Sequence, residues 1–62
     1  MTALEHLVHQ LEEKASYLKD GMSLGRIANF EEYKGTCGKI QGLLEARDLI
    51  KDLMQNMEHS DD

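Results

Sequence analysis

The sequence predicts an all-α fold in which two helices form an antiparallel hairpin. The chain of 62 residues contains no proline, and it is dominated by residues that favour helices, such as leucine, glutamate, lysine and alanine. Two stretches begin with helix-capping residues and continue with apolar side chains at helical spacing. A chain this short forms a single domain, 1–62, whose isolated core is expected to be small.

The first helix is expected to run from about residue 3 to residue 20. Thr2 and Glu5 form a capping box, which satisfies backbone N–H groups that the first helical turn leaves free. Gly21 is expected to end the helix, because glycine commonly follows the last helical turn. The apolar stripe of this helix consists of Leu4, Leu7, Val8, Leu11, Ala15 and Leu18.

A loop over residues 21–28 is expected to lead into a second helix, from Phe30 to about residue 58. Asn29 is the predicted N-cap, and Glu32 stands three residues later as its capping partner. Residues 59–62 form an acidic tail that is expected to fray. The second helix carries a heptad seam whose members are Tyr33, Thr36, Ile40, Leu43, Arg47, Ile50, Met54 and Met57, with Thr36 and Arg47 as its polar positions.

The difference in helix length predicts an unpaired segment. At a rise of 1.5 Å per residue the helices measure roughly 27 Å and roughly 43 Å, which leaves about three turns of the second helix without a partner. These turns would expose a large apolar patch, so the hairpin is expected to oligomerise into a helical bundle, most simply a four-helix dimer. The predicted interface residues are Ile40, Leu43, Leu49, Ile50, Leu53, Met54 and Met57.

Three glycines lie inside the second predicted helix, where each costs about 1 kcal/mol relative to alanine. Gly35, Gly38 and Gly42 share one narrow face, which favours close packing against another helix. A kink or break near Gly35 and Gly38 is the alternative. The surrounding residues lack the preceding strand and the Lys-Ser/Thr ending of a phosphate-binding P-loop, so a nucleotidase is excluded on this basis.

No residue pattern indicates catalysis. Cys37 lies beside the apolar seam and has no histidine near it in the sequence, which favours a small buried residue over a reactive thiol. His6, His9 and Glu13 share a face at metal-ligand spacing, but this is the polar face of the first helix, so solvated side chains are the preferred interpretation. We therefore expect no enzyme, no cofactor and no metal site.

The charge of the chain restricts its partners. Seven basic and twelve acidic residues give a net charge of −5, which disfavours direct nucleic-acid binding. The mean hydropathy is −0.55, and neither a membrane span nor a signal peptide is recognisable, so an intracellular protein without membrane contact is expected. The alternative to a solvated surface is an anion-binding pocket between subunits, formed by Arg26, Lys34, Lys39 and Arg47.

The stretch from Asn29 to Arg47 resembles a pattern in short uncharacterised helical proteins of tailed bacteriophages. The shared features are a leucine-rich first helix, an aromatic-Glu-Tyr start to the second, Gly-x-Ile-x-Gly-Leu in its middle and an acidic tail, and residues 30–52 are the most specific. The resemblance implies a non-enzymatic virion or assembly protein, located in the virion or the host cytoplasm, that binds itself or another phage or host protein. A small inhibitor of a host protein, or a sponge for an anionic nucleotide signal, is the alternative.

Overall fold

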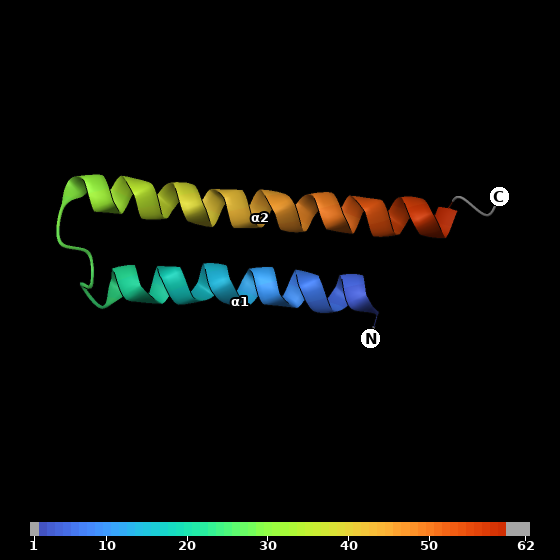
Figure 1. Ribbon diagram of the computed structural model, residues 1–62, viewed down its shortest axis with the longest axis horizontal. Coiled ribbons are helices and arrows are strands. Elements are labelled where there is room, and N and C mark those ends of the chain that lie inside the picture. The colour runs from blue at the N-terminus through green and yellow to red at the C-terminus, as the bar shows by residue number, and fades with distance from the viewer. Residues whose placement is uncertain (1, 60–62) are drawn as a thin grey trace.

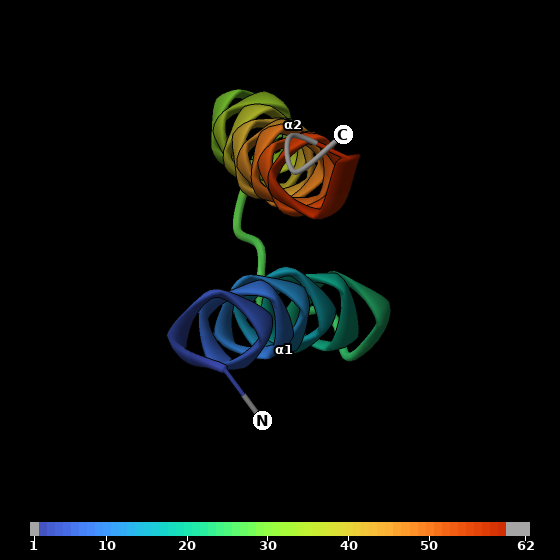
Figure 2. The same cartoon turned by 90° about the vertical axis from the view of Figure 1, so that its right-hand side faces the viewer.

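The computed structural model describes residues 2–59, which form two helices joined by a short loop (Figure 1). Helix α1 spans Ala3–Ser23 and helix α2 spans Phe30–His59. The two helices lie antiparallel, and Figure 2, seen nearly along them, shows them side by side. The predicted all-α hairpin is confirmed. His59, the first residue of the predicted tail, belongs to α2, and the rest of that tail lies outside the described residues.

The start of α1 is the capping box that the sequence predicts. The Thr2 hydroxyl oxygen accepts a hydrogen bond of 3.1 Å from the backbone N–H of Glu5. The same hydroxyl donates to the carboxylate of Glu5 at 3.3 Å. One side chain therefore satisfies a free backbone donor of the first turn and also holds the acidic side chain near the positive end of the helix dipole.

The end of α1 differs from the prediction. Gly21 is part of the helix, which continues to Ser23. The residue with a left-handed backbone is Gly25, at φ 74°. Its N–H donates to the carbonyl of Met22 at 3.2 Å, and the N–H of Arg26 donates to the carbonyl of Gly21 at 3.0 Å. This pair of hydrogen bonds is the Schellman motif, which places the helix-ending glycine four residues later than expected.

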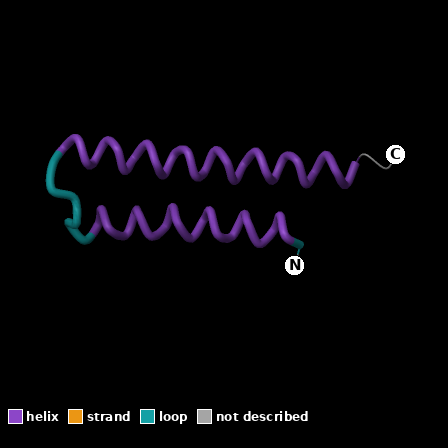
Figure 3. The backbone as a smooth tube through the Cα atoms, viewed as in Figure 1, coloured by secondary structure: helices purple, strands orange, loops and turns teal. Residues whose placement is uncertain are grey.

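Helix α2 begins at the predicted cap and continues without a break. The side-chain oxygen of Asn29 accepts a hydrogen bond of 2.8 Å from the N–H of Glu32. The carboxylate of Glu32 in turn accepts a hydrogen bond from the N–H of Ala28 at 3.3 Å, one residue before the cap. Figure 3 shows α2 as one continuous helix, and its bounds include Gly35 and Gly38, so the predicted alternative of a break at these glycines is wrong.

The core lies between the two helices and is small. Val8, Ala15 and Ile40 are the buried apolar residues in the described part of the chain. The predicted heptad seam of α2 faces α1: besides Ile40, it contains the half-buried residues Thr36, Leu43, Arg47, Ile50 and Met54. The seam therefore holds the hairpin together. Ile40 was predicted to lie in a partner interface, but it belongs to the core of the hairpin.

The alignment of the helices makes the predicted overhang shorter. Glu12 of α1 lies against Arg47 and Lys51 of α2, with nitrogen–oxygen distances of 3.3 and 4.0 Å. Figure 1 shows α2 extending past the start of α1 at its C-terminal end and past the end of α1 at its own N-terminal end. The expected three unpaired turns at the C-terminal end are therefore wrong, because the extra length of α2 is divided between its two ends.

The role of Gly25 in ending α1 can be tested by substitution. Gly25→Ala is expected to lower the free energy of unfolding by about 1 kcal/mol, because a left-handed backbone is costly for any residue with a Cβ atom. Urea denaturation followed by circular dichroism, at one fixed chain concentration, measures this change. Gly21→Ala is the matched control: its Cβ would meet only Arg26 Cδ at 3.9 Å, so stability should rise. Equal losses in both variants would contradict the assignment.

Candidate functional site

One broad side of the hairpin carries a group of ion pairs. The guanidinium of Arg47 lies 3.3 Å from the carboxylate of Glu12 and 2.9 Å from that of Asp48, and Lys51 also approaches Glu12. The hydrogen bond to Asp48, together with the nearby charge of Glu12, raises the pKa of Arg47 above its usual value. We call the side that carries these four residues, Glu12, Arg47, Asp48 and Lys51, the charged side. Their charged groups already pair with one another within the chain.

The opposite broad side carries apolar and small residues, and we call it the apolar side. On α2 these residues fall within about 100° of one another at 100° per residue, on a face that adjoins the seam toward α1 and shares Met57 with it. Lys39 and Asn56 fall within the same arc. On α1, Leu7, Lys14 and Leu18 recur on one face in the same way. The residues of α2 on the apolar side are Gly35, Gly38, Gly42, Ala46, Leu49, Leu53 and Met57.

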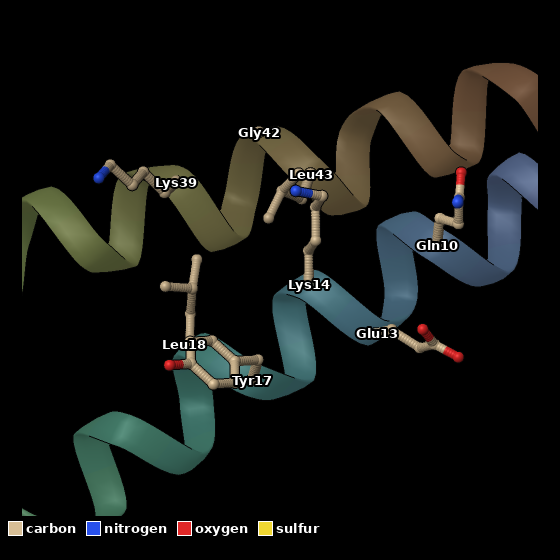
Figure 4. Close-up of a pocket in the computed structure, with 8 residues that line it drawn as sticks. All are labelled: Gln10, Glu13, Lys14, Tyr17, Leu18, Lys39, Gly42 and Leu43. Carbon is tan, nitrogen blue, oxygen red and sulfur yellow. The ribbon is translucent and has the colours of Figure 1, made fainter.

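An open groove of about 880 Å³ lies between the helices on the apolar side (Figure 4). In Figure 4, Leu18 and Lys14 extend from α1 toward α2, where Gly42 leaves the wall of the groove flat. The residues that line the groove show that the face of α1 with Lys14 and Leu18 and the face of α2 with Gly42 border the same side of the hairpin. Its lining residues are Gln10, Glu13, Lys14, Tyr17, Leu18, Lys39, Gly42 and Leu43.

The predicted interface residues divide into two groups in the structure. Leu49 is 70 % exposed and Leu53 is 49 % exposed, so both are open to a partner. Ile50 and Met54 are half-buried on the seam, and they contribute mainly to the hairpin. Leu43 is likewise half-buried where it lines the groove, whereas Met57 is exposed near the C-terminal end of α2.

The glycines of α2 do not bring the two helices of the hairpin closer together. A Cβ atom added at Gly35, Gly38 or Gly42 would meet no atom within 4 Å outside the neighbouring helical backbone. Their close packing against another helix therefore stays a prediction, and it concerns a helix from outside this chain. Within the hairpin they leave a flat, open strip along the apolar side.

The basic residues of the predicted anion pocket are not gathered in one hairpin. Arg47 is engaged by Glu12 and Asp48, and the Nζ of Lys34 lies 5.6 Å from the centroid of the Phe30 ring. Lys39 lines the groove on another face of α2, and Arg26 is in the loop. The four predicted residues therefore do not converge on one phosphate group in a single hairpin.

The histidines of α1 lie beside a second, smaller hollow. His6, His9, Gln10 and Glu13 line a shallow hollow of about 330 Å³. Within residues 2–59, no group of three or more histidine, cysteine, aspartate or glutamate side chains is placed to hold a metal ion. Cys37 is half-buried. Neither described helix has an apolar stretch long enough to cross a membrane.

The groove is the feature that sequence reasoning missed. The heptad pattern placed the predicted partner contacts on α2, and no role in partner binding was predicted for Lys14 and Leu18 of α1. The signal was present in the spacing of Leu7, Lys14 and Leu18 at i, i+7 and i+11, which places them on one face of α1. Compared with known proteins, the chain matches no family model, no curated protein and no solved structure.

The scattered basic residues generate a ligand-binding prediction. We expect cyclic and linear nucleotides to leave the melting temperature unchanged, because Lys34, Lys39 and Arg47 do not converge and Arg47 is already paired. Thermal unfolding with a nucleotide panel, against sodium chloride at matched ionic strength as the control, measures this. A saturable rise in melting temperature with one nucleotide would show that an anion site forms after all.

Proposed function

We propose that this chain is a non-enzymatic protein that acts by associating with other helices through its apolar side. The observation that carries the proposal is the exposure of Leu49 and Leu53, 70 % and 49 %, beside the open strip of Gly38 and Gly42. Contiguous exposed apolar groups on a small protein are characteristic of interaction surfaces. Small residues next to them allow the backbone of another helix to approach closely.

The small core supports the same proposal. No side chain in the described part of the chain is completely removed from solvent, and the buried residues are Val8, Ala15 and Ile40. Chains of fewer than about 70 residues usually need disulfides, a metal or association to be stable. A single cysteine provides no internal disulfide, so burial of Leu49 and Leu53 against a partner is the most direct source of stability.

The resemblance to short phage proteins suggests where such association operates. We propose a virion or assembly component that forms a homo-oligomer, with a dimer as the simplest form, and that docks other phage or host proteins. Inhibition of a host protein would use the same apolar side. A nucleotide sponge has less support, because the basic residues are dispersed over the hairpin.

The association surface can be tested by introducing charge. The double variant Leu49→Asp and Leu53→Asp is expected to reduce the mass in solution from a multiple of 7.1 kDa to the mass of one chain, while helicity is retained in part. Light scattering after size exclusion at two concentrations measures the mass, and circular dichroism measures the helicity.

The matched control is the double variant Gln41→Asp and Gln55→Asp. These residues are exposed on α2 outside the apolar side, and the variant adds the same charge. It is expected to keep the mass of the parent protein. A parent protein that is a stable monomer would refute the proposed homo-oligomer. An oligomer that both double variants leave intact would refute the proposed surface.

A further inference from the structure

We infer that the apolar side is occupied by a second copy of this chain, whose α2 packs antiparallel on the first α2 about a two-fold axis near Ala46. The inference rests on the proposed function and adds the identity and register of the partner. It is carried by the order of large and small residues along α2, by the two directions in which α2 is apolar, and by the size of the face.

Large and small residues on the apolar side occupy opposite halves of α2. Leu49 and Leu53 follow Ala46, whereas Gly42 and Gly38 precede it at nearly the same distances along the helix. Two copies of α2 that cross antiparallel at Ala46 therefore bring Leu49 over Gly42 of the second copy, and Leu53 over Gly38. Each exposed leucine enters the space that a missing Cβ leaves open.

This order of residues favours a second copy over an unrelated helix. An isologous interface requires that one surface carry both a projecting group and the recess that receives it, related by a two-fold axis. The pairs Leu49–Gly42 and Leu53–Gly38 satisfy that condition about the same centre, between Glu45 and Ala46. An unrelated partner would need an apolar stripe on α2, but not this symmetric spacing.

The two apolar directions of α2 fit a four-helix bundle. The seam toward α1, centred on Leu43 and Ile50, and the stripe on the apolar side, centred on Gly42 and Leu53, are separated by roughly 80° at 100° per residue. Each helix of a four-helix bundle contacts two neighbours in directions about a right angle apart. Hence α1 supplies one neighbour of α2, and α2 of the second copy supplies the other.

The face is large enough for a stable dimer. The Cα atoms extend over 51 × 20 × 12 Å, and α1, with 21 residues against 30 in α2, covers part of the longest dimension. A typical stable interface buries about 800 Å² on each partner, which a second hairpin laid along the apolar side provides. In that arrangement the α1 helices also meet, and Leu7 and Tyr17, which are 40 % and 68 % exposed, are covered.

Disulfide formation at the proposed axis tests the register. In a protein that carries Cys37→Ser, the substitution Ala46→Cys is expected to give a cross-linked dimer under mild oxidation, visible on a non-reducing gel. Only residues close to the axis bring their own copies within the Cα separation of about 4.4–6.8 Å that a disulfide requires. The control Gln55→Cys in the same protein lies outside the apolar side and is expected to cross-link far less.

A size exchange provides a second and independent measurement. Gly42→Leu is expected to weaken the dimer by at least about tenfold in Kd, because the added side chain fills the space taken by Leu49 of the second copy. Adding Leu49→Ala to this variant is expected to restore part of the affinity. Sedimentation equilibrium at several chain concentrations measures both values.

The outcomes separate this inference from the proposed function. A dimeric protein that cross-links equally at positions 46 and 55, or that gains nothing from the second substitution, would overturn the register but leave the apolar side as the association surface. A monomeric parent protein would overturn the second-copy inference, but not the association of the apolar side with a different protein. Selective cross-linking at position 46 with partial rescue by Leu49→Ala supports the two-fold arrangement.

Discussion

Two helices can bury only the faces that they turn toward each other, and the rest of this structure follows from that limit. Val8, Ala15 and Ile40 are the buried apolar residues of the described chain, and the remaining seam residues are half-buried. A second layer of helices is the only way for such a hairpin to remove more apolar surface from water. The apolar side, with Leu49 and Leu53, is where that layer would lie.

Features that depend on nearest neighbours in the sequence could be predicted, and features that depend on distant ones could not. Thr2 and Asn29 cap their helices as expected, because a cap needs only a side-chain oxygen and an N–H three residues away. Gly21 and Gly25 are equally capable of ending α1. Met22 is half-buried, which favours the continuation of α1 past Gly21 to Ser23. This burial arises only once the chain has folded.

The same distinction between local and long-range features explains which parts of the candidate site could be predicted. The heptad pattern of α2 correctly indicated the seam, because periodicity depends only on residue spacing. The alignment of α1 with α2 depends on the conformation of the loop, which spacing does not reveal, so the predicted overhang was wrong. Whether Leu49 and Ile50 face a partner or the hairpin follows from that alignment: Leu49 is exposed, and Ile50 is half-buried.

The glycines make the helix propensity of α2 uneven along its length. Gly35, Gly38 and Gly42 lower the intrinsic helix propensity of the first half, whereas the second half, from Leu43 to Met57, contains none. The first half is therefore the part whose backbone opens most readily to hydrogen exchange in a free chain. Docking against the glycine strip would slow that exchange, so binding and the local order of the helix are thermodynamically coupled.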